Sequence, residues 1–519
     1  MATRTLSAAG GTWSVGATWD EGIAPVLGDA VVCRGDGTSG QLTISGAAAC
    51  TSINFTNYSN TLTINATLSV SGAVTLAAAM TITTSSGSPL LSCLVTATLT
   101  SNGKTWGQPI QFAGTSQTYT LADNWTVSNF TSAGATQVTI NGNTLNISGN
   151  LTATTAIVAG TTNLVMTGTG TWSGAGSLRM NLTFNSAGTI TWSGTVTYGL
   201  GSLVYTAGTM VTTGSTLTIN TNIVSVTLNL GGMNINNISF ANNTTHTLSS
   251  DINALGNVAI SATSSSATIN GFTVYVGGNL TNNTTTSATL GTTAFIMNGS
   301  GTLNFPNYST GAMRNNITIN TAGTIVIGNV SYNTGSFIHT ASGSISVTAG
   351  STLNISLNGT TTIDSNGIQW VNAVFNQTTT GTYTFNSLFV ATGTVTTTSQ
   401  GSMVFNGTAG FTIANFVIQT TGTATFTLTQ GNTYIVTTSL TNFYSAVGSK
   451  VTFASSSATL QVIFTLSVGA TCAVGGTNAT RIDSSGGRPI RDFGSNTFTT
   501  TNNWYNFTDL AERISASVS

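Results

Sequence analysis

Two stretches of the chain decide its fold, because the second nearly repeats the first. Residues 181–208 read "NLTFNSAGTITWSGTVTYGLGSLVYTAG", and residues 316–343 read "NITINTAGTIVIGNVSYNTGSFIHTASG". Upstream, "FAGTSQTYTLADN" (112–124) pairs with "FANNTTHTLSSDI" (240–252) in the same order, and a fainter third copy begins at Phe375. The two offsets are similar, since 240 − 112 = 128 and 316 − 181 = 135. Ordered self-similarity at a nearly fixed period is the signature of a repeat architecture.

The composition indicates an all-β repeat. Charged residues are 4% of the chain, against roughly 25% in ordinary globular proteins. Threonine and valine favour a pleated surface, while glycine and asparagine favour turns. Short pieces that alternate apolar and polar residues recur without any helical segment between them. Two architectures fit this pattern, an antiparallel sandwich or barrel array and a parallel β-solenoid.

The spacing of leucines favours the solenoid. Leu164, Leu182 and Leu203 open successive strand-like pieces, at intervals of 182 − 164 = 18 and 203 − 182 = 21. About 20 residues per turn suits one coil of a β-helix, in which each coil needs its neighbours to bury its inner face. We therefore predict one β-helix of roughly 20–25 coils, from about residue 10 to about residue 505. The residues that open the three copies should occupy equivalent coil positions: Phe112, Phe240 and Phe375.

Charge is concentrated near the two ends of the chain. Between residues 37 and 480 there are only seven charged residues. Open sheet edges invite aggregation, so we interpret the charged ends as caps. The predicted cap or assembly residues are Trp13, Trp19, Asp29, Arg481, Asp483, Arg488, Arg491 and Asp492. The predicted domains are an N-terminal cap with first coils (1–60), a repetitive body (61–430) with duplicated blocks at 112–239 and 240–374 and a third copy from 375, C-terminal coils and cap (431–507), and a short tail (508–519).

Both ends resemble a known group of proteins. The opening "GGTWSVGATWDEGIAPVLGDAVV" (10–32) resembles the first coils of right-handed β-helix surface proteins of phages and bacteria. The closing coils (431–490) look like the last coils of the same group, with a "DSSGG" turn at 483–487 and an Asn-Asn-Trp ending at Trp504. The resemblance implies a right-handed parallel β-helix. It also implies a fibre, spike or adhesin on a phage particle or a cell surface.

The start of the chain bears on location. "MATRTLSAAGG" (1–11) has no apolar segment of the kind that a secretory signal needs. If the chain is the complete gene product, this favours a phage protein on the exterior of the virion over an exported bacterial cell-surface protein. No run of 18 apolar residues occurs, although the mean hydropathy is +0.24, so we expect no membrane insertion.

Catalysis has little support in the body of the chain. Glycan hydrolysis usually needs two carboxylates, and the body offers Asp123, Asp251 and Asp364. Asp123 and Asp251 occupy equivalent places in two copies, and Ser387 takes that place in the third, so we interpret them as turn residues. Arg179 and Arg314 are likewise copies of each other. His246 and His339 have no acidic neighbours in sequence, so we expect ordinary core or surface histidines and no enzyme activity.

Several residues suit binding. Trp106, Trp125, Trp192 and Trp370 can stack on sugars if they are exposed, although Trp192 alternates with Ile190 and equally suits the core. Arg34-Gly35-Asp36 matches the integrin tripeptide, which we interpret as coincidence in a glycine-rich loop. The net charge is −1 without a basic patch, which argues against nucleic acid.

The cysteines do not form a disulfide framework. No C-x-x-C occurs and there are only two histidines, so we predict no metal and no cofactor. We expect Cys33, Cys50, Cys93 and Cys472 to be buried thiols. Cys33 and Cys50 should share one stacked column, because their interval (50 − 33 = 17) is close to one coil.

The sequence therefore favours a non-enzymatic structural or receptor-binding fibre, or a decoration protein, of a phage virion. We expect it to serve host-surface attachment, with a surface glycan or protein as receptor. A β-helix glycan depolymerase and a bacterial adhesin remain the alternatives. Identical chains commonly form closed symmetric assemblies, so we expect a homo-oligomer, most commonly a trimer, bound to other virion proteins.

Overall fold

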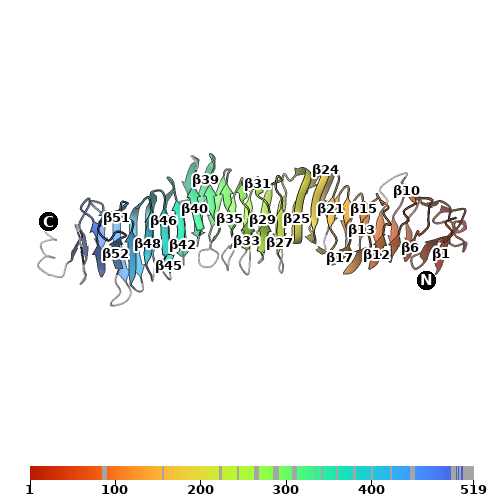
Figure 1. Ribbon diagram of the computed structural model, residues 1–519, viewed down its shortest axis with the longest axis horizontal. Helices are drawn as coiled ribbons and strands as arrows, with labels where there is room; N and C mark the ends of the chain where they lie inside the picture. Colours follow the sequence, from red (N-terminus) through yellow and green to blue (C-terminus); the bar gives the residue numbers. More distant parts are fainter. Residues whose placement is uncertain are drawn as a thin grey trace. The chain divides into compact units, whose positions relative to one another are not determined.

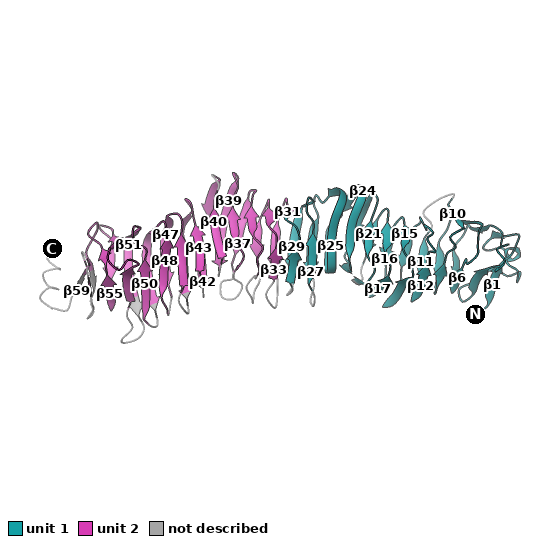
Figure 2. Ribbon diagram, in the orientation of Figure 1, with its two compact units in different colours: residues 1–252 teal, residues 253–519 magenta. Residues whose placement is uncertain are grey.

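The chain folds as a parallel β-solenoid of about 19 turns, close to the predicted 20–25 coils (Figure 1). In this computed structural model strands make up 59% of the chain, and the described residues contain no α-helix. Two compact units divide it, unit 1 (Met1–Ile252) and unit 2 (Asn253–Ser519), which Figure 2 colours separately. The structure describes residues 1–84, 90–154, 157–220, 225–241, 245–261, 268–283, 291–306, 313–332, 335–340, 343–357, 360–377, 381–398, 401–420, 423–444, 451–492, 498–499, 501 and 504–506.

In unit 1 the strands pair in parallel with the strands one turn away. A first ladder runs from the first strand to the end of the unit, and each of its members pairs with the next. Its members are β1 (Thr3–Leu6), β3 (Ala30–Cys33), β6 (Ser52–Asn54), β9 (Val74–Thr75), β12 (Ala97–Thr100), β14 (Gln117–Leu121), β17 (Gln137–Gly142), β20 (Ile157–Ala159), β23 (Ser177–Arg179), β25 (Thr195–Val211), β26 (Thr216–Asn220) and β29 (Asn237–Ala241).

The other strands of unit 1 form further ladders. The second joins β15 (Trp125–Val127), β18 (Leu145–Ile147), β21 (Leu164–Met166), β24 (Leu182–Trp192), β25, β27 (Val226–Asn229) and β30 (Thr245–Leu248). The third joins β5 (Ala48–Cys50), β8 (Leu68–Val70), β11 (Leu91–Cys93), β13 (Ile110–Phe112), β16 (Phe130–Ser132), β19 (Leu151–Ala153), β22 (Gly170–Ser173), β24 and β25. A four-stranded sheet joins β2 (Gly11–Thr12), β4 (Leu42–Ile44), β7 (Thr61–Ile64) and β10 (Thr81–Thr83).

Unit 2 repeats the parallel arrangement. One ladder contains β34 (Val274–Val276), β36 (Phe295–Met297), β38 (Ile317–Ile319), β40 (Gly335–His339), β43 (Thr360–Asp364), β46 (Gly381–Phe385), β48 (Met403–Gly407), β50 (Ala424–Leu428), β52 (Val451–Ser455), β55 (Thr477–Thr480) and β58 (Phe498–Thr499). Its partner ladder contains β35 (Leu280–Asn282), β37 (Gly301–Phe305), β39 (Thr324–Tyr332), β42 (Thr352–Leu357), β45 (Asn372–Gln377), β47 (Phe389–Thr397), β49 (Phe411–Thr420), β51 (Thr433–Tyr444) and β54 (Thr471–Ala473).

The spacing of the leucines in the sequence matches the register of the second ladder. Leu164 lies beside Leu182, and Leu182 beside Leu203, as their intervals in the sequence predict. The same column includes three more leucines in unit 1. All six are buried: Leu145, Leu164, Leu182, Leu203, Leu228 and Leu248. Because side chains alternate between the two faces of a strand, this register keeps one apolar face inside throughout the column.

The prediction for the phenylalanines is wrong in unit 1, because Phe112 and Phe240 lie in different ladders. Phe112 is on β13 in the third ladder, whereas Phe240 is on β29 in the first. Stepping from Phe240 towards the N-terminus, one turn at a time, leads after six pairings to Gln117, an interval of 240 − 117 = 123. The interval from Phe112 to Phe240 is 240 − 112 = 128, which is longer than these six turns. Because the copied block is longer than six turns, the second copy starts further around the coil than the first, and its phenylalanine falls in the next ladder.

The copied residues nevertheless make the same local contacts. The Asn129 Oδ1 atom accepts a hydrogen bond from the Asn150 amide at 2.7 Å, and Asn150 Oδ1 accepts one from Thr171 at 2.9 Å. In unit 2, Asn257 and Asn279 repeat this relay at 2.9 and 2.8 Å. These asparagines lie where the chain turns between strands, so a side-chain oxygen supplies the acceptor that the backbone ladder lacks there. The abundance of asparagine follows from this repeated use.

Replacing Asn150 with alanine should weaken the turn at this level. The Thr171 amide loses its acceptor, at a cost of about 1 kcal/mol because the site is exposed to water. Amide hydrogen exchange at Thr171 should quicken about fivefold, whereas Asn150→Asp, which keeps an acceptor oxygen, should exchange almost as the parent does. Unchanged exchange at Thr171 in Asn150→Ala would show that the side chain contributes nothing.

Candidate functional site

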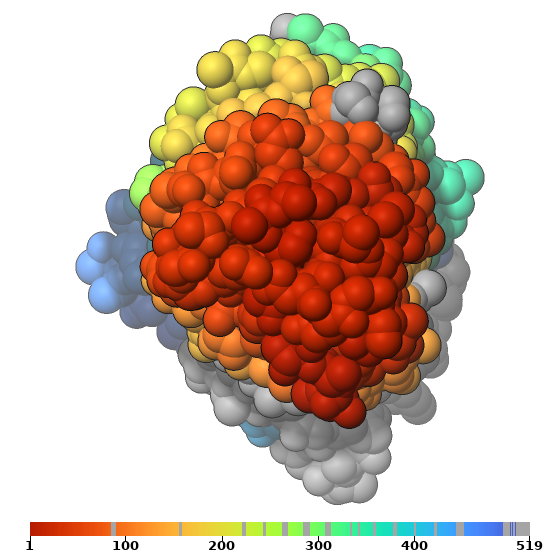
Figure 3. Space-filling view, turned by 90° about the vertical axis from the view of Figure 1, so that its right-hand side faces the viewer, coloured from red at the N-terminus to blue at the C-terminus, as the bar shows by residue number. Residues whose placement is uncertain are grey.

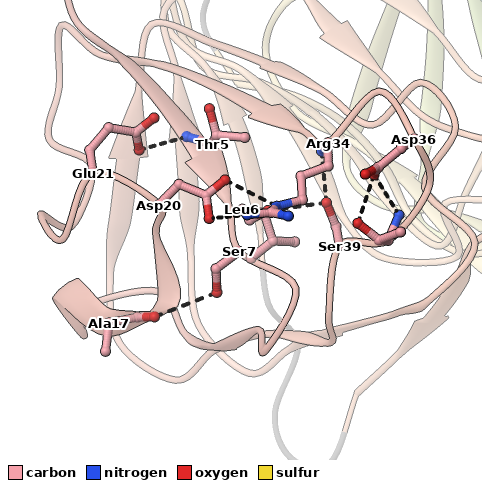
Figure 4. Close-up of polar contacts among 10 residues, drawn as sticks. Thr5, Leu6, Ser7, Ala17, Asp20, Glu21, Arg34, Asp36 and Ser39 are labelled. Carbon is pink, nitrogen blue, oxygen red and sulfur yellow. Dashed lines mark hydrogen bonds and ion pairs between the residues drawn. The ribbon is translucent and has the colours of Figure 1, made fainter.

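Charged residues gather in the first turn of unit 1, which is longer than the later ones. Thr3 pairs with Ala30, an interval of 30 − 3 = 27, and the chain between β1 and β3 contains the short 3₁₀ helix η1 (Gly16–Thr18). We call residues 7–29 the cap. Figure 4 shows the polar contacts of the cap with Thr5 and Arg34, and beside them the contacts of Ser39 with Leu6 and Arg34.

The cap covers the free edge of the first strand. One edge of β1 pairs with β3. On its other edge, the Thr5 carbonyl accepts a hydrogen bond from the Asp20 amide at 2.9 Å, and the Thr5 amide donates one to Glu21 Oε2 at 2.8 Å. The Ser7 amide donates to the Thr18 carbonyl at 2.9 Å. An uncovered edge is a template for pairing with another chain, so these bonds seal the first layer of unit 1.

Asp29 anchors the cap to the N-terminus. Its carboxylate accepts hydrogen bonds from the Arg4 guanidinium at 3.0 Å, the Ala2 amide at 3.2 Å and the Val26 amide at 3.3 Å. The hydrogen bond from Arg4 is the main reason that the pKa of Asp29 lies below its ordinary value. The buried carboxylate therefore holds both ends of the first turn.

Trp13 and Trp19 form the apolar centre of the cap. Both are buried, their rings meet edge to face with centroids 5.3 Å apart, and the Trp19 Nε1 atom donates a hydrogen bond to the Trp13 carbonyl at 2.9 Å. Trp13, Trp19 and Asp29, the three N-terminal residues that the sequence singled out, all lie in the cap, where the two tryptophans pack on each other and Asp29 bonds to Arg4, Ala2 and Val26.

The integrin-like tripeptide is used within the fold. The Arg34 guanidinium makes two hydrogen bonds to the Asp20 carboxylate, at 2.7 and 3.1 Å. Asp36 Oδ1 accepts hydrogen bonds from the Thr38 amide and hydroxyl, which closes a local turn and is the main cause of the lowered pKa of Asp36. Both charged side chains of the tripeptide form bonds within the fold. This agrees with the interpretation that the match to the integrin-binding tripeptide is a coincidence.

The predicted C-terminal cap residues lie in the last turns of unit 2. The Arg481 amide donates to the Thr499 carbonyl at 2.9 Å, the Asp483 carboxylate accepts from the Ser485 amide at 2.9 Å, and the Arg488 guanidinium donates to the Ala470 carbonyl. Arg491 and Asp492 lie on β57 (Ile490–Asp492), which pairs with β59 (Trp504–Asn506). Their side chains lie outside the described part of the structure.

The four tryptophans that suit sugar stacking if exposed are in the core, so the exposure that this binding role needs is absent, and Trp192 takes the core position that its alternation with Ile190 also allowed. Trp106, Trp125, Trp192 and Trp370 are at most 2% exposed. Trp125 lies in the leucine column, beside Leu145, and Trp192 packs edge to face on Trp172. Alternation along a strand shows which residues share a face, but not which face is inside. Large aromatic rings gain most from burial, so they fill the interior.

One body carboxylate has a clear structural task. Asp123 Oδ1 and Oδ2 accept hydrogen bonds from the Ser101 and Asn102 amides, one turn back, at 2.7 and 2.6 Å. In the third copy, Ser387 Oγ accepts the Asn366 amide at 2.7 Å in the same way. The position therefore needs an oxygen acceptor and not a titratable acid, which agrees with a turn residue.

The other charged residues of the body are dispersed. Asp364 ends β43 with its side chain half-exposed, and among the described residues that side chain has no hydrogen-bond or ion-pair partner. Asp251 does have a polar interaction. Arg179 lies on β23 between Ala159 and Leu200, and Arg314, its copy, is exposed.

Both histidines are buried. His246 is fully buried beside Phe240 with ring centroids 5.3 Å apart, and neither ring nitrogen has a hydrogen-bond partner among the described residues. Burial lowers the pKa of His246 to about 4, because the charged ring would lose its hydration. His339 has its Nδ1 atom 3.0 Å from the Asn366 carbonyl oxygen. Neither histidine faces solvent as a catalytic base would.

The four cysteines are free thiols, but only Cys33, Cys50 and Cys93 are buried as predicted, Cys472 is half-buried, and the predicted column is wrong. Cys33 lies on β3 in the first ladder, whereas Cys50 lies on β5 in the third, beside Val70. Val70 in turn lies beside Cys93, so Cys50 and Cys93 share a column two turns apart. The interval from Cys33 to Cys50 is shorter than a full turn here, and it moves the second thiol to another ladder.

Thiol labelling should separate these cysteines. Cys33, Cys50 and Cys93 are buried and burial raises the pKa of each, to about 12 for the first two, whereas Cys472 is half-exposed. In the native protein at pH 8 we expect an aromatic disulfide reagent to modify Cys472 alone, because thiolate and access are both needed. All four should react after denaturation. Rapid reaction of a Cys472→Ser variant would contradict the burial of the other three.

Within the described ranges, no three His, Cys, Asp or Glu side chains lie close enough together to hold a metal ion. No helix in the described part of the chain has the length and apolar character of a membrane span. A scan of protein-family models gave no match to the chain, and searches of curated proteins and of solved structures gave none either.

Sequence reasoning missed the apolar tip of the cap. Four large apolar side chains within residues 15–27 face solvent: Val15, Ile23, Val26 and Leu27. The signal was present as "GIAPVLG" (22–28), an apolar run between acidic residues. An apolar run of this kind predicts a core segment. In the structure, however, Pro25 is buried while Ile23, Val26 and Leu27 are exposed.

Proposed function

We propose that the protein is a non-enzymatic structural or receptor-binding fibre, or a decoration protein, on the exterior of a bacteriophage virion, where it serves attachment to the host surface. The observation that supports this most is the filled interior of the solenoid. The tryptophans predicted for glycan binding lie in its core, and Asp123 is bound to backbone amides. The strand positions between the buried ones are mostly threonine, serine and asparagine, so the outer faces of the strands are rich in hydroxyl and amide groups. Such a surface suits a durable particle component better than an active site.

The resemblance of both ends to surface β-helix proteins supports the same proposal. We propose further that the chain works as a homo-oligomer, with a trimer as the favoured state, bound to other virion proteins. A host-surface glycan or protein is the proposed receptor. We propose no cofactor, no nucleic-acid ligand and no membrane insertion.

The experiment is to locate the chain on particles. Purified virions of the phage that encodes it should bind gold-labelled antibody against the chain at fixed sites with a regular copy number, seen by electron microscopy. Purified virions that lack the chain would refute the proposal. Label on uninfected bacterial cells would favour the adhesin instead.

Glycan depolymerase activity is the alternative function, and one residue, Asp364, favours it. Asp364 is the body carboxylate without a polar partner among the described residues, so it is the one to test. We expect no release of reducing ends from host envelope polysaccharide. Release that Asp364→Asn abolishes, while the variant stays folded, would establish the enzyme.

A further inference from the structure

The cap carries an exposed apolar tip on a firmly held loop. Val15, Ile23, Val26 and Leu27 are 50%, 56%, 61% and 58% exposed. The loop is not loose, since the Val26 amide donates to the Asp29 carboxylate and the Asp29 amide donates to the Val26 carbonyl at 3.0 Å. Folding therefore holds four large apolar side chains in water. Clustered exposure of this kind marks interaction sites more often than scattered single residues do.

The tip lies on the outermost layer of unit 1. Asp20 and Glu21 of the cap bond to the edge of β1 that faces away from β3, and the four side chains of the tip remain exposed beyond them. Figure 3 shows this N-terminal surface, in red, facing the viewer. Because the cap already occupies the edge of β1, a partner cannot add as a further strand there. It must contact the side chains of the tip.

The charge around the tip selects the kind of partner. Residues 1–37 contain two arginines and four acidic residues, so their side chains carry 2 − 4 = −2. Arg4 pairs with Asp29 and Arg34 with Asp20, and Arg34 also acts electrostatically on Asp36. This leaves Glu21, two residues before Ile23 in the chain, outside the ion pairs of the described residues. A second copy placed against the tip would bring like charges together. A partner with basic residues around an apolar centre would be complementary.

From these observations we infer that the tip formed by Val15, Ile23, Val26 and Leu27 is a docking surface for a protein segment with an apolar face and a basic rim. This inference goes beyond the proposed function and does not depend on it, because it concerns the cap of the isolated chain. An amphipathic segment of this kind places its apolar side chains on the tip and its lysines or arginines near Glu21.

The test uses the purified full chain and two synthetic probes, an amphipathic leucine–lysine peptide and the leucine–glutamate peptide of the same pattern. We expect the leucine–lysine peptide to bind in titration calorimetry, and the leucine–glutamate peptide to bind at least about tenfold more weakly. Raising sodium chloride from about 0.05 M to about 0.5 M should weaken the first several-fold, because salt screens exposed charges.

Matched variants locate the binding. Ile23→Ser, Val26→Ser and Leu27→Ser together should weaken the leucine–lysine peptide about tenfold or more. The control replaces three similarly exposed residues of unit 2, Leu255, Phe272 and Leu388, with serine and should bind as the parent does. If the triple cap variant melts early, the single Leu27→Lys variant replaces it and should weaken the same peptide.

Three results would overturn the inference. The leucine–lysine peptide could fail to bind the parent chain or bind the cap variants equally well. The leucine–glutamate peptide could bind as tightly, which would remove the charge argument. The parent chain could self-associate in light scattering through a contact that the cap variants abolish, which would make a second copy the occupant. Absence of the chain from virions would refute only the proposed function and leave these measurements unaffected.

Discussion

Replacing Trp19 with alanine should destabilise the first turns of unit 1 by about 3–5 kcal/mol and make the protein aggregate. The side chain is buried against Trp13 and donates a hydrogen bond to its carbonyl, so its loss leaves a cavity and an unmet acceptor in the cap. With the cap loosened, the Thr5 and Ser7 amides lose their partners, and the edge of β1 becomes free to pair with another chain. Hydrogen exchange at Thr5 and Ser7 and light scattering during mild heating measure the two effects.

A second tryptophan pair provides the control. Trp192 meets Trp172 at the same centroid distance of 5.3 Å and in the same edge-to-face geometry, but in the middle of unit 1. Trp192→Ala should therefore lose comparable stability without freeing a terminal edge. If Trp192→Ala scatters light as strongly as Trp19→Ala under matched unfolding, general destabilisation explains the aggregation and the cap does not protect the edge. Trp19→Phe, which keeps a ring, should have an intermediate effect.

Acid should destabilise the protein through His246. The folded pKa of about 4 lies below the ordinary value of about 6.5, so the unfolded chain takes up the proton first as the pH falls. The contribution of the neutral ring is fully present above pH 6.5 and is lost progressively down to pH 4. Over that window the free energy of unfolding should fall by about 3 kcal/mol on account of this residue. Denaturant unfolding at several pH values across this window measures the slope.

Leucine at position 246 isolates the effect. His246→Leu fills the buried site next to Phe240 with an apolar side chain that does not titrate, so its stability should be nearly flat over the upper part of the window. Carboxylates with a lowered pKa, such as Asp29, also lose their contribution in acid, but at lower pH and equally in both proteins. The difference between the two curves therefore belongs to the histidine. Parallel curves for parent and variant would show that His246 keeps its ordinary titration in the fold.

The cap and the body were predictable to different degrees. Trp13, Trp19 and Asp29 could be placed in a cap because charge is scarce elsewhere, so its concentration near an end marks a place that the repeat cannot supply. The bonds from Asp20 and Glu21 to Thr5 could not be predicted, since they depend on how the cap folds back on β1. The apolar tip was missed for a related reason. A short apolar run has no periodicity that separates core from surface.

The sequence by itself determined the parallel coil and the register of the leucine column. These follow from alternation along a strand and from a nearly constant turn length, which are properties of neighbouring positions. The tertiary structure alone decided that the tryptophans face inward, that Cys50 shares a column with Cys93, and that Phe240 lies one ladder on from Phe112. Six turns are slightly shorter than the copied block, so small differences in turn length add up along the chain. The position of a residue around the coil therefore depends on all the turns between it and its copy.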